Sequence, residues 1–278
     1  MSVQIASINS GSNGNCYYIG NSTEAVLIDA GISVRETEKR MKRMGLTIDR
    51  VKAIFVSHEH GDHISGVPGL SKKYHLPVYI TTPTLANGNI PIANELHYVF
   101  RPHEPVQIGA LSVTAFPKYH DAADPHSFMI SQDKLHIGVF TDIGVVCRQL
   151  EKYFKQCHAA FLEANYDTDM LEKGNYPYHL KKRISGGQGH LSNEQALQLF
   201  RSHKPPYMSH LLLAHLSKNN NHPQLVEDLF MRHASGTEIV VASRYKETTV
   251  YEITGNSFVP VPAIKKKTVT TTAQLSLF

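Results

Sequence analysis

The sequence AIFVSHEHGDH occupies residues 53–63, where an apolar run meets a cluster of histidines. Its first four residues are apolar and partly β-branched, a pattern that predicts a buried β-strand. This strand would deliver His58, His60, Asp62 and His63 onto the loop at its end. Side-chain packing does not account for four ligand-type side chains in so short a loop, and we expect a metal-binding loop.

The spacing His-x-His-x-Asp-His divides these side chains into two groups. In an extended or looped backbone His58 and His60 project to one side, so both imidazoles can reach a single ion. Asp62 and His63 then face a second position close by, as in a two-metal hydrolase that activates a water and binds an anionic substrate. A polar loop or a one-metal structural site is the alternative, although structural sites usually draw on cysteine thiolates. Residues 64–74 favour a helix whose N-terminus points back at this site.

The motif and the strand before it resemble those of the metallo-β-lactamase fold superfamily. The resemblance implies an α/β protein with an αββα four-layer sandwich, and two divalent metal ions. It also implies a first metal held by His58, His60 and His120, a second held by Asp62, His63 and His215, and Asp142 as the bridging ligand. In the same way it implies that Asp29 orients the metal-bearing loop without binding metal.

The implied ligands are five imidazoles and two carboxylates, which suit Zn²⁺, Mn²⁺ or Fe²⁺. Two divalent ions against two carboxylates leave a cationic site that favours hydroxide and an anionic ester. A metal-bound hydroxide is the expected nucleophile, because metal binding lowers the pKa of water to about 7. We also count Asp62, one of the implied ligands, among the catalytic residues.

Glu163 and His190 resemble a pair found in the nuclease branches of the superfamily. There an acid after a strand orients a histidine that protonates the leaving alkoxide, and a carboxylate neighbour raises the basicity of a histidine and fixes its tautomer. We expect His190 to be the general acid and Glu163 to orient it. The alternative is that His190 merely precedes a helix, which Ser192 and Gln195 would begin with a capping box.

Five further motifs are similar to those of the YycJ (WalJ) group within the superfamily. They are SGSNGN at residues 10–15, IDAG at 28–31, EANYD at 163–167, GHLSN at 189–193 and HLSKNN at 215–220. This resemblance spans most of the chain, includes the absence of an inserted β-CASP domain, and implies a metal-dependent exonuclease acting on DNA from the 5′ end. Tyr166 stands where a histidine is expected, and His126 is a second departure.

The loop at residues 10–15 is rich in small polar residues. Its backbone could form a nest for an anion such as phosphate, which would involve Ser10, Ser12, Asn13 and Asn15. A simple tight turn fits the sequence equally well.

Composition is ordinary for a soluble globular chain, with 278 residues, 41% hydrophobic residues, 19% charged residues and a net charge of +4. The three cysteines, Cys16, Cys147 and Cys157, suggest neither a disulfide framework nor a thiolate metal site. No apolar run is long enough to span a membrane. We therefore expect a cytoplasmic protein without a membrane partner.

The chain divides into a hydrolase domain at residues 1–255 and a basic tail at residues 256–278. The tail has three consecutive lysines and many threonines, so we expect a flexible linker. Its last five residues resemble the bacterial sliding-clamp-binding motif, which implies that the DNA polymerase clamp binds Gln274, Leu275, Leu277 and Phe278. A C-terminal strand or a random apolar end is the alternative.

The sequence therefore predicts a phosphodiesterase, most simply a 5′-to-3′ DNA exonuclease in repair or replication. The alternatives are an RNase Z-like ribonuclease, a small-molecule thioesterase or lactonase of the same fold, and a metal-bound scaffold without turnover. The pair of Glu163 and His190 argues against a small-molecule substrate, and the tail argues for DNA over RNA.

Overall fold

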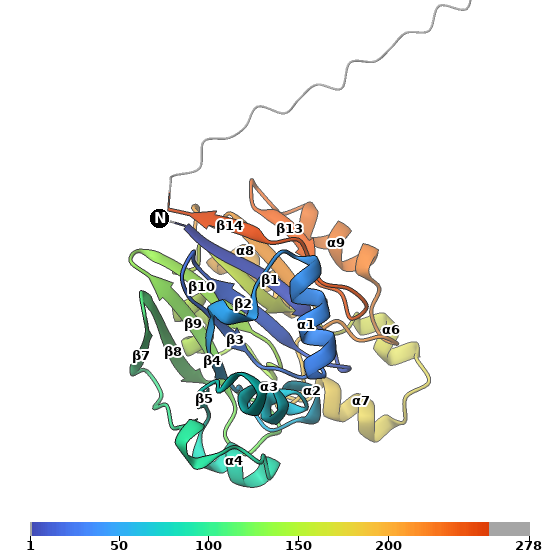
Figure 1. Ribbon diagram of the computed structural model, residues 1–278. Helices are drawn as coiled ribbons and strands as arrows, with labels where there is room; N and C mark the ends of the chain where they lie inside the picture. Colours follow the sequence, from blue (N-terminus) through green and yellow to red (C-terminus); the bar gives the residue numbers. More distant parts are fainter. Residues whose placement is uncertain (1, 256–278) are drawn as a thin grey trace, which may run out of the picture.

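The computed structural model describes residues 2–255, which form two facing seven-stranded sheets flanked by helices (Figure 1). The first sheet has the order β14 (Tyr251–Thr254), β1 (Ser2–Asn9), β2 (Cys16–Gly20), β3 (Ala25–Ile28), β4 (Val51–Phe55), β5 (Val78–Tyr79) and β6 (His97–Tyr98). The second has the order β13 (Glu238–Val241), β12 (His210–Ala214), β11 (Ala159–Glu163), β10 (Leu135–Phe140), β9 (His126–Gln132), β8 (Leu111–Pro117) and β7 (Pro105–Ile108).

Three hydrophobic clusters separate the four layers. Phe55, Phe128 and Phe161 belong to the cluster between the two sheets. A second cluster joins the other face of the first sheet to α1 (Val34–Arg43) and α3 (Val67–Tyr74), and a third joins the second sheet to α5 (Arg148–Phe154), α8 (Asn193–His203) and α9 (Pro223–Met231). The predicted αββα sandwich is therefore confirmed.

The remaining helices are short and lie in the connections between strands. They are α2 (Gly61–Ile64), α4 (Thr82–Gly88), α6 (Thr168–Lys173) and α7 (Tyr178–Ser185), with 3₁₀ turns at Ile48–Arg50 and Asn94–Leu96. In Figure 1, α6 and α7 project from the body of the molecule. Tyr166 is buried beneath them with Leu171 and Ile184, so its phenol ring packs as a core side chain.

Parallel strands bring the functional loops to one edge. Strands β3 to β6 run parallel, as do β10 to β13. The carboxyl ends of parallel strands share an edge of the sheet, and ligand sites in open α/β sheets form there. The loops after β4, β10, β11 and β12 can therefore converge.

The helix predicted over residues 64–74 is confirmed from Val67 onward, whereas its predicted start is wrong because Ser65 and Gly66 separate α2 from α3. The amide of Gly66 donates to the carbonyl of Ala30 at 2.7 Å, and a Cβ at Gly66 would lie 2.0 Å from the carbonyl oxygen of Ile32. Contact with the loop after β3 therefore replaces a continuous helix. The capping box is confirmed, with Ser192 Oγ accepting from the amide of Gln195 at 3.2 Å and Gln195 Oε1 from that of Ser192 at 2.9 Å.

Residues 256–278, and with them the predicted tail and clamp-binding residues, lie outside the described residues. Within residues 2–255 the longest helix, α8, has 11 residues, and no helix combines the length and apolar character needed to cross a membrane.

Candidate metal centre

The predicted ligands come together where the two sheets meet. The loop after β4 carries His58, His60, Asp62 and His63, while the second sheet supplies three more side chains from separate loops. These are His120 after β8, Asp142 after β10 and His215 after β12. Each half of the sandwich therefore contributes part of one cluster.

Three imidazoles form the first group, with ligand atoms that lie within 4.8 Å of one another. His58 Nε2 is 3.1 Å from His60 Nδ1, which is 3.3 Å from His120 Nε2. Ligand atoms about 2.0–2.1 Å from a tetrahedral ion lie about 3.3 Å apart, so this spacing fits one divalent ion. Burial lowers the pKa of His58 well below its usual value and that of His120 to about 2, which keeps both lone pairs free for a metal.

Asp62, His63 and His215 form the second group. His63 Nε2 lies 3.6 Å from Asp62 Oδ2 and 3.2 Å from Asp142 Oδ2. Burial disfavours the imidazolium form of His63, yet Asp142 and Asp29 raise its pKa well above the usual value. A divalent cation could replace that proton, and these donors fit a second ion.

Asp142 lies between the two groups and is 1% exposed. Its Oδ1 is 3.4 Å from His215 Nε2 and 3.8 Å from His120 Nε2, while Oδ2 faces His63. Burial opposes ionisation, but His215 and His63 hold the pKa of this carboxyl well below its usual value. An ionised carboxylate in contact with both groups is suited to bridge two metal ions, and the whole cluster is typical of a dinuclear site.

Asp29 supports the metal loop and is fully buried. Its Oδ1 accepts from the amide of Ser57 at 2.7 Å, and its Oδ2 contacts Ser57 Oγ at 2.8 Å and His63 Nδ1 at 2.7 Å. Because Nδ1 of His63 is engaged, Nε2 faces the cluster. Asp29, Asp142 and His215 all have left-handed backbone, with φ of 59°, 55° and 55°.

The loop before β2 also contacts the cluster. Asn15 Nδ2 donates to Asp62 Oδ2 at 3.1 Å, and Asn15 Oδ1 lies 3.1 Å from His215 Nδ1. Ser10 Oγ accepts from the amide of His215 at 2.8 Å. Asn15 and Ser10 therefore contact the ligand-type residues directly. Ser12 and Asn13 are exposed, and an anion nest at this loop stays a prediction.

The predicted acid pair lies beside the cluster. His190 Nδ1 is 2.7 Å from Glu163 Oε1, and the imidazole ring is 5.3 Å from the rings of both His120 and His215. Glu163 is fully buried, and its Oε2 accepts from the amide of Ile143 at 2.7 Å. Burial lowers the pKa of His190, but Glu163 first, and then Asp142 and Asp121, raise it, so that it lies above its usual value overall.

Two supporting residues escaped the sequence analysis. Lys118 is buried, and its Nζ donates to the carbonyl of Thr141 at 2.7 Å, directly before Asp142. Asn165 Nδ2 donates to the carbonyl of His215 at 2.8 Å. Asn165 lies inside a motif already noted, whereas a lone lysine beside a strand end gives no signal.

His126, the second departure from the group's pattern, is buried, and its amide donates to the carbonyl of Ser57 at 2.9 Å, directly before the metal loop. Its ring packs edge-on against Phe100, and its Nδ1 lies 2.9 Å from the carbonyl of Asp124.

Comparison with known proteins agrees with this geometry. The model of the beta-lactamase superfamily domain matches residues 24–215. Exodeoxyribonuclease YycJ of Bacillus anthracis is 35% identical over 230 residues, covering 81% of this chain and 86% of that protein. Exodeoxyribonuclease WalJ of Streptococcus pneumoniae is 27% identical over 260 residues, covering 92% of this chain and 96% of that protein.

Among solved structures, the metallo-β-lactamase fold protein YhfI of Bacillus subtilis superposes with a TM-score of 0.70 at 17% identity. The match covers 90% of this chain and 99% of YhfI and supports the fold. Sequence and fold agree with a His/Asp cluster of the dinuclear type. The chain belongs to the metallo-β-lactamase superfamily and is a metal-dependent hydrolase homologous to these exodeoxyribonucleases.

Proposed function

We propose that this protein is a metal-dependent phosphodiesterase that shortens DNA from the 5′ end, in repair or replication. The observation that carries the proposal is the contact of 2.7 Å between His190 and Glu163 beside the His/Asp cluster. A carboxylate-oriented imidazole suits a leaving group that needs a proton, as the alkoxide of a phosphodiester does. The likeness to YycJ and WalJ, both named exodeoxyribonucleases, supports DNA as the substrate.

The seven ligand-type side chains would hold two ions of Zn²⁺, Mn²⁺ or Fe²⁺, three imidazoles at one position and Asp62, His63 and His215 at the other. Bound there, divalent ions supply a water of lowered pKa and positive charge for the phosphate oxygens. Asp142 would contact both ions, and Asp29 and Asn15 would fix the orientation of their ligands.

His190 acts as the general acid in this proposal. Its Nδ1 hydrogen faces Glu163, so Nε2 is the atom that holds the proton to be given to the leaving oxygen. The Glu163 carboxylate stabilises the imidazolium form, which keeps a larger fraction of His190 protonated near neutral pH. After transfer, the neutral imidazole remains hydrogen-bonded and can take up a new proton from water.

The test is digestion of 5′-phosphorylated, end-labelled duplex DNA and matched RNA in Mn²⁺, with an Asp62→Ala protein beside the unaltered one. We expect stepwise shortening of DNA by the unaltered protein alone. Label at the 5′ end should appear at once as mononucleotide, whereas label at the 3′ end should pass through successively shorter strands. Preference for RNA would favour a ribonuclease, and absence of cutting would favour a small-molecule hydrolase or a scaffold.

We also infer from the sequence that residues 256–278 form a basic linker after the hydrolase domain and that Gln274, Leu275, Leu277 and Phe278 bind the DNA polymerase sliding clamp. These residues lie outside the described part of the chain. Tethering would raise the effective concentration of the nuclease at newly made DNA, in the cytoplasm. Removal of the last five residues should abolish clamp binding and leave turnover of short DNA unchanged. Loss of that turnover would contradict the assignment.

A further inference from the structure

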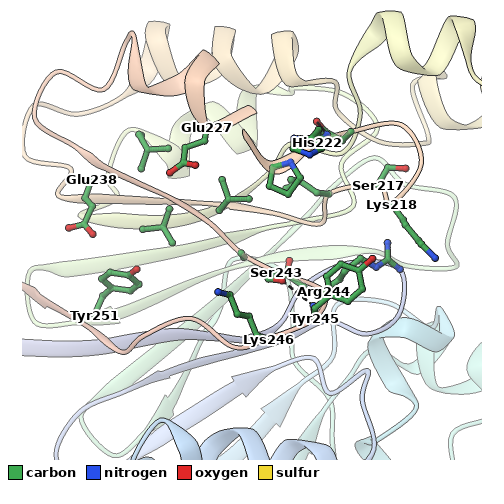
Figure 2. Close-up of a pocket in the computed structure, with 18 residues that line it drawn as sticks. Ser217, Lys218, His222, Glu227, Glu238, Ser243, Arg244, Tyr245, Lys246 and Tyr251 are labelled. Atoms are coloured by element: carbon green, nitrogen blue, oxygen red, sulfur yellow. Dashed lines mark hydrogen bonds between the residues drawn. The ribbon is translucent and has the colours of Figure 1, made fainter. Parts of the chain in front are cut away.

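A cleft of about 770 Å³ lies beside the metal centre and takes no part in the chemistry described above. The loops after β12 and β13 line it, and Figure 2 shows its side chains. Lys218, Arg244 and Tyr245 lie toward one end, with Lys246 next to them. The cleft therefore has a basic and aromatic end.

This basic end is next to a metal ligand. Strands β12 and β13 are parallel neighbours, with Leu213 opposite Val241, and the amide of Ala242 donates to the carbonyl of Leu213 at 2.9 Å. His215 follows β12 and Arg244 follows β13, and neighbouring strands are about 4.8 Å apart. A chain held at the metal centre can thus continue directly into the cleft.

Within residues 2–255 the cations of the cleft have no anionic partner. Lys218, Arg244 and Lys246 form no ion pair with any residue from 2 to 255. The Nη1 atom of Arg244 is buried and lacks a hydrogen-bond partner within that range. The Arg244 side chain also lines the cleft, where a phosphate oxygen can accept a charge-assisted hydrogen bond from its guanidinium. Tyr245 is 72% exposed and offers a face for a base.

The backbone that carries these side chains is held in place from two sides. Ser243 O accepts from the amide of Ser10 at 3.2 Å, and Arg244 O accepts from Asn13 Nδ2 at 2.9 Å. On the other side Tyr245 O accepts from Arg40 Nη2 at 3.3 Å. Arg43 of α1 also donates two hydrogen bonds to the carboxylate of Glu247, further along the same loop. The side chains are thus presented on a fixed loop, which lowers the entropic cost of binding.

We propose that this cleft binds a single DNA strand next to the nucleotide being cleaved, with Arg244, Lys218 and Lys246 on its phosphates and Tyr245 stacked on a base. This inference rests on the proposed function, since it names how the same site holds its substrate. Glu227 and Glu238 line the opposite end of the cleft and would repel phosphates there. The bound segment is therefore short and lies at the basic end.

The test is fluorescence anisotropy of a short 5′-phosphorylated single strand with phosphorothioate linkages, bound to the full, Mn²⁺-loaded protein before cutting occurs. We expect Arg244→Ala to weaken binding about tenfold. Lys218→Ala combined with Lys246→Ala should reduce the slope of log affinity against log salt by about 0.7 per cation removed. Tyr245→Ala should weaken binding of the normal strand about tenfold and leave an abasic strand unaffected.

Lys134→Ala is the matched control, because Lys134 is an exposed lysine in the turn between β9 and β10. The affinity of Lys134→Ala for the strand, and the salt dependence of that affinity, should equal those of the unaltered protein. Arg244→Lys keeps the positive charge and should retain part of the affinity. Unchanged binding in Arg244→Ala, or no binding of the strand by the unaltered protein, overturns the proposal. If the unaltered protein binds the strand in the cleft but degrades no DNA, the proposed function fails while the cleft assignment stands.

Discussion

In the proposed mechanism, His190 and Glu163 carry the distinction between a nuclease and other hydrolases of this fold. A proton donor matters only when the leaving group is a poor one, such as a sugar alkoxide. The contact of 2.7 Å between the two side chains and the full burial of Glu163 make this pair a unit. Its role can therefore be separated from that of the metal ligands.

Replacing His190 with Asn, or Glu163 with Gln, should lower kcat on DNA by roughly a hundredfold or more. Hydrolysis of bis(p-nitrophenyl) phosphate should fall much less, because p-nitrophenolate leaves without a proton. The measurement is kcat on both substrates, with His75→Asn as control, since His75 has a φ of 53° that Asn tolerates. Equal losses on both substrates would show that the pair holds the site together instead.

The pH profile gives an independent readout of the same pair. In the proposed mechanism, activity on DNA requires protonated His190, so kcat should fall as pH rises through the pKa of this group. Glu163 raises that pKa, and Glu163→Gln removes the carboxylate. The decline at high pH should therefore begin at a lower pH in the variant, and a decline at unchanged pH would assign it to another group.

Lys118 donates to the carbonyl of Thr141, the residue directly before Asp142. Lys118→Met leaves that buried carbonyl without its donor and should reduce the free energy of unfolding by about 1–3 kcal/mol. Affinity for Mn²⁺ should fall as well, because Thr141 precedes Asp142. Urea unfolding and metal competition measure the two effects, with the exposed Lys134→Met as control. Unaltered metal affinity would limit Lys118 to a role in stability.

At the scale of elements, the loops after the strands position the site through close backbone contact. A Cβ at Gly31, in the loop after β3, would lie 1.7 Å from the carbonyl oxygen of Asp62 in the metal loop. The amide of Gly31 also donates to the carbonyl of Asn15 at 2.8 Å. Three loops therefore meet at a glycine that has no room for a side chain.

Gly31→Ala should accordingly displace Asp62, lower the free energy of unfolding by roughly 3 kcal/mol or more, and abolish tight metal binding. Gly187→Ala is the control, because a Cβ at Gly187 would meet nothing within 4 Å. Circular dichroism melting and metal analysis of the purified proteins provide the measurement. Normal metal content in Gly31→Ala would mean that the loop can shift without loss of the site.

The same elements explain what the sequence could predict. The ligands at the end of β4 were predictable because their spacing is local, and the other strand ends followed from apolar runs and motifs. Lys118 and Asn15 act on partners 23 and 200 residues away, on Thr141 and His215, and no pattern within one element encodes such contacts. The break between α2 and α3 was missed for the same reason, since the loop after β3 causes it.

At the scale of the whole molecule, the cluster joins two sheets that are otherwise held by an apolar layer. The first sheet provides the loop of His58 to His63, and the second provides His120, Asp142 and His215. A metal ion that binds ligands from both sheets binds the folded state and not the unfolded chain, so it adds to stability by mass action.

Removal of metal should therefore lower Tm. A ligand at about 1,000 times its Kd adds about 4 kcal/mol to the free energy of unfolding. In a chain of this size 1 kcal/mol shifts Tm by about 2–4 °C, so we expect Tm to decrease by roughly 10 °C. Calorimetry of protein treated with a chelator, then reloaded with Mn²⁺ or Zn²⁺, tests this. In His60→Ala, the difference in Tm between the chelator-treated and the metal-reloaded protein should be smaller. Equal Tm values of the unaltered protein with and without metal would contradict the prediction.

The left-handed backbone at Asp29, Asp142 and His215 has a consequence for the evolution of this chain. Glycine adopts that conformation freely, whereas most other residues adopt it at a cost of about 1–2 kcal/mol. Selection for a durable fold alone would favour glycine at Asp142 and His215, whereas Asp29 also accepts a hydrogen bond from the buried amide of Ser57. A lineage that gave up catalysis but kept the fold would be expected to drift first at residues 142 and 215, so glycine at these two sites would identify relatives that survive as binding proteins.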